Sequence, residues 1–280
     1  MEIFLKLFNG HHVTRRGFLK TMMIGSVGAF LGAKIEEATG RTLTAPSEAV
    51  PPLPWPYVKL DPVEVAERAY VGYWKVCCCY GVAESIIGSL QDKIGFPYTT
   101  IPTMMFHFGC GGMHHWGYLC GALAAASVVT HIIAGNPDKA VSEKTAWPIA
   151  TDVYRYFENE SIPDPNFIPK APRYPEVKVR SIVPGNTLCH SYVMKICNLQ
   201  KCDPGDPPRK ETCARLAASV AMKLTEYLNM WADQRFKPVY SKPASAVGCL
   251  KCHSAGGVSS YRGWGEWDCT QCHKQAWKHP

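Results

Sequence analysis

The chain has 280 residues, a formal net charge of +7 at pH 7 and 13 cysteines. This length suffices for one domain of ordinary size plus a small appended one. Residues 1–33 hold four basic side chains and one acidic one, so the rest of the chain carries +7 less +3, a net charge of +4. A charge this small does not indicate nucleic-acid binding.

The N-terminus has the pattern of a twin-arginine export signal. Arg15 and Arg16 precede an apolar run from Thr21 to Ala33 that is rich in glycine and other small residues. The run, at about 13 residues, is short of the roughly 20 that span a membrane. The alternative interpretation is a basic amphipathic helix at the start of the folded domain. Such a helix needs a polar face, which this apolar run lacks. The signal predicts a periplasmic protein. Three fates of the signal remain as alternatives: cleavage after Ala33, cleavage after Ala45, and retention as an uncleaved membrane anchor.

Residues 34–60 are predicted to be a proline-rich linker, because five prolines lie between Pro46 and Pro56. A helical, cysteine-rich domain is expected over residues 61–236. Its first helix begins at Asp61-Pro62, an N-cap followed by proline, and runs to about residue 73. A second helix is predicted over residues 80–94, ended by a glycine and a proline.

The remaining elements of this domain are also predicted to be helical. An alanine-rich, almost uncharged helix over residues 116–134 must be buried on most sides. A fourth helix follows Asn136-Pro137 and contains a kink at Pro148. Residues 161–185 contain six prolines and are predicted to be an extended loop, for which we expect a dimer contact. Helices over residues 188–198 and 210–236 complete the domain, so the expected fold class is mainly α.

The C-terminal segment, residues 237–280, has little periodicity and contains two Cys-x-x-Cys-His motifs. These are Cys249, Cys252 and His253, then Cys269, Cys272 and His273. Two thiols at this spacing attach the vinyl groups of a c-type haem, and the adjacent imidazole is its proximal iron ligand. The segment is therefore predicted to be a small, mostly irregular dihaem domain. The same four cysteines also fit a zinc ribbon, but a zinc ribbon has no use for the histidine after each pair.

Nine cysteines remain outside these motifs, and they suggest a second cofactor. The twin-arginine route carries folded proteins, so a cofactor inserted before export is expected. Thiolates from several helices, enclosed by apolar residues, suit an iron-sulfur centre. Structural disulfides are the alternative in an exported protein, and Cys197 with Cys202 is one such pair, although an odd number of cysteines cannot all pair.

Four stretches of the helical region resemble a known family. They are CCCYGVAESIIGSL, GCGGMHHWGYLCGALAAA, NTLCHSYVMKIC and ETCARLAASVAMKL. They resemble the redox-active C_GCAxxG_C_C family and, together with the two haem motifs, the split-Soret cytochromes c; the likeness covers about residues 70–280. This resemblance implies a homodimer in which each subunit holds a [2Fe-2S] cluster in a helical domain and two stacked bis-histidine haems in a C-terminal domain.

Carried over residue by residue, the family pattern implies that the cluster ligands are Cys79, Cys120, Cys189 and Cys213. Ala125 stands where the pattern often has its second glycine, which loosens the registration without removing a thiol. Cys197 remains an alternative to Cys189.

Each haem iron needs a distal histidine as well. The pair His114 and His115 stands out, because haem-free relatives usually have small residues after the glycines that precede it. His190 and His279 are alternatives, whereas a lone helical histidine such as His131 is more often a packed side chain. The split-Soret arrangement implies that one distal ligand comes from the partner subunit.

These residues favour a periplasmic electron carrier with no catalytic residues, since closed bis-histidine haems pass electrons singly. We expect a homodimer that exchanges electrons with redox partner proteins and contacts the membrane only through an uncleaved signal. The alternative is a multihaem reductase of a small nitrogen or sulfur oxyanion, which requires an open iron position and nearby acids. A zinc-ribbon interaction protein is a third possibility, which export and the helical cysteine region disfavour.

Overall fold

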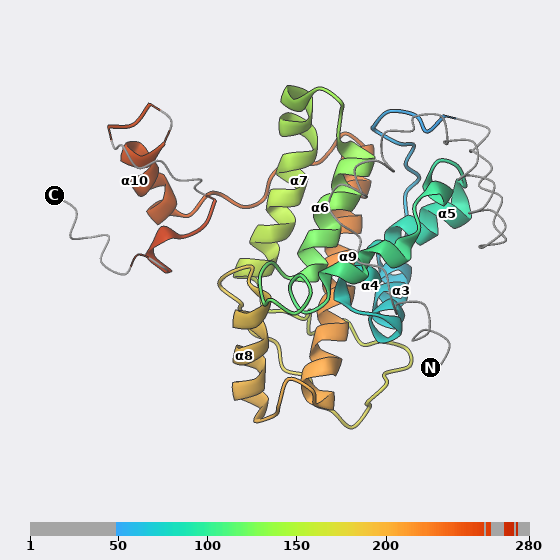
Figure 1. Ribbon diagram of the computed structural model, residues 1–280, viewed down its shortest axis with the longest axis vertical. Coiled ribbons are helices and arrows are strands. Elements are labelled where there is room, and N and C mark those ends of the chain that lie inside the picture. Colours follow the sequence, from blue (N-terminus) through green and yellow to red (C-terminus); the bar gives the residue numbers. More distant parts are fainter. Residues whose placement is uncertain (1–48, 255, 259–265, 272, 274–280) are drawn as a thin grey trace, which may run out of the picture. The chain divides into compact units, whose positions relative to one another are not determined.

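The computed structural model describes residues 49–254, 256–258, 266–271 and 273. The chain divides into two units, residues 1–49 and 50–280, and the second is considered below. Its described part is α-helical with two isolated β-bridges, which confirms the mainly α fold class (Figure 1). The predicted export signal lies outside the described residues. No helix of the described part is both long and apolar enough to cross a membrane.

The first two helices follow the sequence prediction closely. Helix α3 (Pro62–Lys75) begins at Asp61, whose carboxylate accepts hydrogen bonds from the amides of Val63 and Glu64. The second helical stretch starts at Cys78, two residues earlier than predicted. It comprises α4 (Cys78–Ala83), a π-helical turn (Glu84–Gly88) and α5 (Ser89–Lys93). Short 3₁₀ turns follow at Tyr98–Thr100 and Thr103–Gly109.

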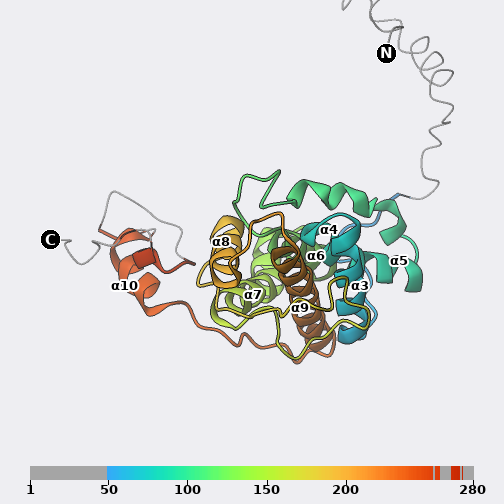
Figure 2. The same ribbon diagram turned by 90° about the horizontal axis from the view of Figure 1, so that it is seen from below.

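The other helices of this body are α6 (Gly121–Ala134), α7 (Lys139–Asn159), α8 (Cys189–Gln200) and α9 (Pro207–Ala232). Helix α9 packs along α3 and also contacts α4, α6, α7 and α8, and both views show it beside α3 and α6 (Figures 1 and 2). The prediction that α6 begins at Trp116 is wrong. Gly117 has a φ of 74°, and Leu119 instead forms a β-bridge with Leu188.

Helices α3 and α4 approach so closely that their backbones touch. A Cβ atom on Gly81 would lie 2.6 Å from the carbonyl oxygen of Ala69, and one on Gly72 would lie 2.8 Å from the Cα of Gly81. Real Cβ atoms do not tolerate such distances, so both positions require glycine. This contact fixes the start of α4, and with it the cysteines Cys78 and Cys79, against α3.

The proline-rich arm is part of the packed structure and is not a free linker over its whole predicted length. Trp55 is only 8% exposed, and its amide donates a hydrogen bond to the carbonyl of Ile132 at 2.9 Å. The hydroxyl of Tyr57 donates to the Asn229 side chain at 2.8 Å. The sequence predicts that the domain begins at residue 61, but the core begins at Trp55, because burial of these aromatic side chains outweighs the extended character that proline gives the arm.

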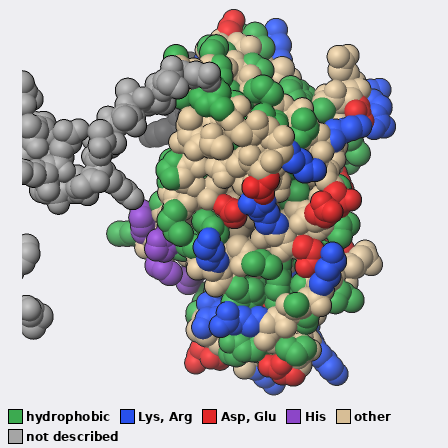
Figure 3. Space-filling model, turned by 90° about the vertical axis from the view of Figure 1, so that its right-hand side faces the viewer, with side chains coloured by type: hydrophobic (Ala, Val, Ile, Leu, Met, Phe, Trp, Pro, Cys, Tyr) green, Lys and Arg blue, Asp and Glu red, His purple; other side chains and the backbone are tan. Residues whose placement is uncertain are grey.

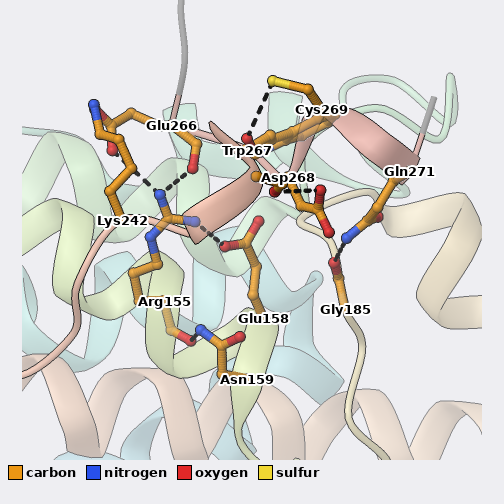
Figure 4. Close-up of polar contacts among 11 residues, drawn as sticks. Arg155, Glu158, Asn159, Gly185, Lys242, Glu266, Trp267, Asp268, Cys269 and Gln271 are labelled. Carbon is orange, nitrogen blue, oxygen red and sulfur yellow. Dashed lines mark hydrogen bonds and ion pairs between the residues drawn. The ribbon is translucent and has the colours of Figure 1, made fainter. Parts of the chain in front are cut away.

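The C-terminal segment contains more regular structure than predicted. Helix α10 (Ala244–His253) carries the first Cys-x-x-Cys-His motif, and a 3₁₀ turn (Cys269–Gln271) carries part of the second. Arg155 of α7, with a side chain only 4% exposed, bonds both to Glu158 at 2.7 Å and to Glu266 (Figure 4). Lys242 contacts the same Glu266 carboxylate at 2.7 Å. These contacts attach the segment to the helical body.

Candidate metal centre

A cavity of about 690 Å³ lies where α4, α8 and α9 begin, beneath the loop over residues 110–117. Its lining is rich in soft and imidazole ligands. The cysteines that line it are Cys77, Cys78, Cys110, Cys189 and Cys213, and the histidines are His107, His115 and His190. No comparable concentration of thiols occurs elsewhere in the described part of the chain. Thiolate and imidazole are the ligands that proteins use for zinc, copper and iron-sulfur centres.

Cys78 interacts electrostatically with three other thiols. A hydrogen bond with the Cys120 thiol lowers the pKa of Cys78, and the same bond, together with burial, raises the pKa of Cys120 well above its ordinary value. The charge on Cys78 also acts on Cys189 and Cys213. Cys78, Cys120, Cys189 and Cys213 therefore share one electrostatic environment.

Three of these four thiols lie at the beginnings of helices. Cys78 and Cys189 are the first residues of α4 and α8, and Cys120 is the N-cap of α6. The positive end of a helix dipole favours the thiolate, which is the form that binds metal. Burial acts in the opposite direction and raises the pKa of Cys189 to about 12. An empty site therefore holds mostly neutral thiols, and binding a metal centre would release their protons.

Cys213 differs from the other three because it has a cationic neighbour. Burial raises its pKa to about 11, while the Arg209 guanidinium, one helical turn earlier in α9, opposes that rise through its charge and a hydrogen bond. Arg209 is thus placed to balance negative charge that accumulates on the thiolates.

The predicted ligand Cys79 lies elsewhere. It is fully buried, and its thiol interacts with the backbone at Gly109 and Ala125. Of the four predicted ligands the structure brings together Cys120, Cys189 and Cys213, with Cys78 beside them. Neighbouring residues on a helix point about 100° apart, so the register of three consecutive cysteines depends on where α4 begins. The sequence prediction placed that start two residues too late.

Two glycines allow the chain to close around the thiols. A Cβ on Gly121 would lie 3.1 Å from the Cys78 sulfur, and one on Gly112, where φ is 71°, would lie 2.7 Å from the Cβ of Cys189. Within the described residues, no three Cys, His, Asp or Glu side chains are arranged to hold a single metal ion as they stand. The fit to an iron-sulfur centre rests on the donor set: four thiols from four separate elements beside one cavity, which is the ligation such centres use.

The histidine loop, residues 111–118, has an unusual backbone. Five consecutive residues, Gly111 to His115, have φ between 49° and 71°, and three of them are not glycine. Such left-handed runs are costly for L-residues and persist only where surrounding structure imposes them. Here the amide of His115 donates to the Cys110 carbonyl at 2.9 Å, and the amide of Gly117 donates to the Gly111 carbonyl at 3.0 Å.

Three of the candidate distal ligands, those within the described residues, lie on the surface of the helical body. His114, His115 and His190 are all exposed, and the latter two line the thiol cavity. His107 lines it as well, although sequence analysis did not select it as a ligand. Figure 3 shows histidine side chains gathered on one face of the molecule, beside hydrophobic ones. The signal that would have found His107 is its position three residues before Cys110.

Large exposed apolar side chains lie close to these histidines in the chain. Trp116 is 72% exposed and Tyr118 57% exposed, and their rings stack with centroids 6.0 Å apart. Met104 and Met105 are each more than half exposed. A cluster of large exposed apolar groups beside polar ones is typical of a surface that another molecule covers.

The two haem motifs meet in the C-terminal segment. The thiols of Cys249 and Cys269, the first cysteine of each motif, form a hydrogen bond. The amide of His273 donates to the Cys269 carbonyl at 2.9 Å, and His253 is the last residue of α10. Cys272 and His279 lie outside the described residues. His131 packs in α6, with Nδ1 2.9 Å from the Ser127 carbonyl oxygen.

Comparisons with known proteins agree with this architecture. The family model of the C_GCAxxG_C_C redox-active proteins matches residues 77–227. Split-Soret cytochrome c of Desulfovibrio desulfuricans (strain ATCC 27774 / DSM 6949 / MB) is 32% identical over 258 residues, which are 89% of this chain and 87% of the relative. A solved structure of the split-Soret cytochrome c from Desulfovibrio desulfuricans ATCC 27774, described as having a novel iron centre, is similar with a TM-score of 0.71. It is 32% identical, and the match covers 81% of this chain and 95% of that one. The chain therefore belongs to the C_GCAxxG_C_C redox-active family and, within it, to the split-Soret cytochromes c.

Proposed function

We propose that this protein is a periplasmic electron carrier that holds two covalently bound, bis-histidine c-type haems and one [2Fe-2S] cluster in each subunit of a homodimer. The observation that carries the proposal is the grouping of Cys78, Cys120, Cys189 and Cys213 in a chain that also has two haem-attachment motifs. Family membership supports the haem and iron chemistry in general terms. The [2Fe-2S] type of the cluster, the number of haems and the periplasmic location of the protein are what we propose beyond family membership.

The four thiols would hold the iron-sulfur cluster, which, when bound, accepts and donates one electron at a time. The chain's own contribution is to bury it: Cys78, Cys120 and Cys213 are all less than a tenth exposed. Burial disfavours added negative charge and so lowers the reduction potential, whereas the Arg209 cation beside Cys213 raises it. These opposing influences would set the potential of the centre.

The C-terminal segment would hold the haems through Cys249 and Cys252, and through Cys269 and Cys272, with His253 and His273 as proximal ligands. Contact between the Cys249 and Cys269 thiols supports attachment of the two groups close to each other. Close spacing suits a carrier, because an electron that enters at one haem can pass to the other.

The distal ligands in this proposal are His114, His115 or His190, with His279 as the remaining candidate. The exposed apolar side chains beside them support a homodimer in which this surface meets the partner subunit. Redox partner proteins would supply and remove the electrons. The twin-arginine signal supports export of the folded protein, with haem attachment after export.

The visible absorption spectrum of purified, exported protein tests the proposal. We expect low-spin c-type haem bands, two haems and two non-haem irons per subunit, and no spectral change when carbon monoxide is added to the reduced form. Absence of haem bands would contradict the central claim. High-spin bands, or a shift with carbon monoxide, would show an open iron position and favour the reductase alternative.

A further inference from the structure

The C-terminal end of α8 brings two cysteines together outside the group of four. Lys201, directly after the helix, has a φ of 49°, and the amide of Cys202 donates a hydrogen bond to the carbonyl of Cys197 at 3.1 Å. This is the long-range bond of a Schellman cap, a helix ending in which the side chains of those two residues face each other. The cap therefore explains why Cys197 and Cys202 meet.

The two thiols are in direct contact and differ in accessibility. A hydrogen bond joins them, and burial raises the pKa of Cys197 to about 11. Cys197 is 4% exposed, whereas Cys202 is partly exposed and can be reached from solvent. A disulfide needs two β-carbons held close together, and attack begins at the more accessible thiol.

We propose that Cys197 and Cys202 form a disulfide bond in the exported protein. The two thiols lose their protons, a bond forms between their sulfurs, and two electrons pass to the disulfide of a thiol oxidase, which becomes a dithiol. This inference rests on the export proposed above, because a thiol pair stays reduced in the cytoplasm. It also removes Cys197 from the thiols available to the iron-sulfur centre.

The bond would stabilise the chain between two of the thiols beside the cavity. Cys189 is the first residue of α8 and Cys213 lies in the second turn of α9, so the connection between these helices sets their separation. Hydrogen bonds already brace it: the Asp203 amide donates to the Asp206 carboxylate at 2.7 Å, and Arg209 donates to the Pro204 carbonyl. A disulfide between Cys197 and Cys202 would fix covalently the turn by which the chain leaves α8 and enters this connection.

Peptide mapping of the exported full-length holoprotein tests the bond directly. Free thiols are alkylated in acid without reductant, and the protein is then digested with trypsin, which cuts after Lys195, Lys201 and Arg209. We expect peptides 196–201 and 202–209 to be recovered as one linked species, lighter than the two thiol peptides by two hydrogen atoms, which separates on reduction. Recovery of both peptides in alkylated form from exported protein would overturn the disulfide alone. Recovery of the chain only from the cytoplasm would overturn export, and the disulfide with it.

Variants provide an independent readout. We expect Cys197→Ser, Cys202→Ser and the double variant to share one lowered Tm, because either single change removes the whole bond, while iron per chain stays at the wild-type level. Single-variant decreases in Tm that add up in the double variant would show two separate thiols and contradict the bond. Loss of iron in Cys197→Ser but not in Cys202→Ser would show that Cys197 is a cluster ligand and would also contradict it.

Discussion

At the scale of single residues, the choice between Cys78 and Cys79 shows what geometry adds to a motif. Both are buried and both belong to the run of three cysteines at residues 77–79. Only Cys78 combines contact with the Cys120 thiol and a place on the cavity wall, whereas Cys79 faces the backbone of Gly109. A thiol packed against backbone and a thiol placed on the cavity wall therefore stand next to each other in the chain.

Serine substitutions distinguish these two roles. We expect Cys78→Ser to lose more than half of the non-haem iron, because the hydroxyl is a poor replacement for a thiolate ligand. Cys79→Ser should keep its iron and lose only stability, about 1–3 kcal/mol for a buried hydroxyl without a good partner. Iron and acid-labile sulfide analysis checks both. Normal iron in Cys78→Ser with depleted iron in Cys79→Ser would restore the ligand set that the sequence predicted.

The distal histidines can be separated by their spectra. We expect replacement of His115 by Met to change the spin state or ligand signature of one haem and leave the other unchanged, because His115 lines the cavity and its backbone is held in place. Replacement of His114 by Met tests whether His114 is a distal ligand. His131→Met is the control, since the His131 ring already bonds to the Ser127 carbonyl. Unchanged low-spin spectra in both the His114 and His115 variants would assign the ligand to His190 or His279.

Some of these residues could be predicted from the sequence and others could not. Haem attachment requires its cysteines and histidine at a fixed covalent spacing, so the sequence alone predicts His253 and His273 as proximal ligands, with no need of a fold. Cys79 is implied by the registration of the family motif on three consecutive cysteines, and the sequence cannot show that Cys78, not Cys79, is the one that contacts the Cys120 thiol and lines the cavity. The sequence offers Cys197 and Cys202 as a disulfide pair, but the left-handed residue at Lys201 that brings them into contact has a residue type that gives no signal of it.

At the scale of elements, the contact between α3 and α4 determines where the first cysteines lie. Gly72 and Gly81 remove the side chains that would otherwise separate these helices. Caps and periodicity in the sequence predict both helices, but nothing in the sequence indicates that the two helices touch. For α6 the sequence prediction failed at the start, because the positive φ angles that precede the helix occur at Met113, His114 and His115 as well as at glycines.

We expect Gly81→Ala to lower the free energy of unfolding by about 1–3 kcal/mol, because the new methyl group would overlap the α3 backbone. The displaced α4 should also carry Cys78 away from Cys120, so iron content should fall. Gly205→Ala is the matched control: nothing lies within 4 Å of the added carbon, and the expected change is within about 0.5 kcal/mol. Chemical denaturation and iron analysis measure both effects, and equal stabilities of the two variants would refute the close approach.

At the scale of the whole molecule, Arg155 connects the C-terminal segment to the helical body. Its buried guanidinium bonds to Glu158 within α7 and to Glu266 across 111 residues of sequence. The sequence marks α7 as helical but gives no signal for this partner, since an ion pair so distant in the chain depends on the finished fold. Breaking a buried pair is costly because one charge is left without compensation.

Replacing Arg155 by Gln should therefore free the C-terminal segment and leave the Glu158 carboxylate buried without its cation. We expect trypsin to cleave the segment at least several times faster than in the wild type, and the free energy of unfolding to fall by about 3–5 kcal/mol. Lys242→Gln removes only the exposed partner of Glu266 and should cost no more than about 1 kcal/mol. Equal proteolysis rates in the two variants would show that Arg155 is not the anchor.

The histidine loop is also the cap of α8. The amides of Cys189 and His190, which a helix start leaves without intrahelical partners, donate to the carbonyls of Tyr118 and Gly117 at 2.7 and 3.0 Å. Cys189 and His190 are joined by one peptide bond, and both line the same cavity. In the proposed carrier, an electron passing from a centre on that thiol to one on that imidazole would tunnel through a few covalent bonds of the same backbone segment. The capped start of α8 would thus also be a path for the electron.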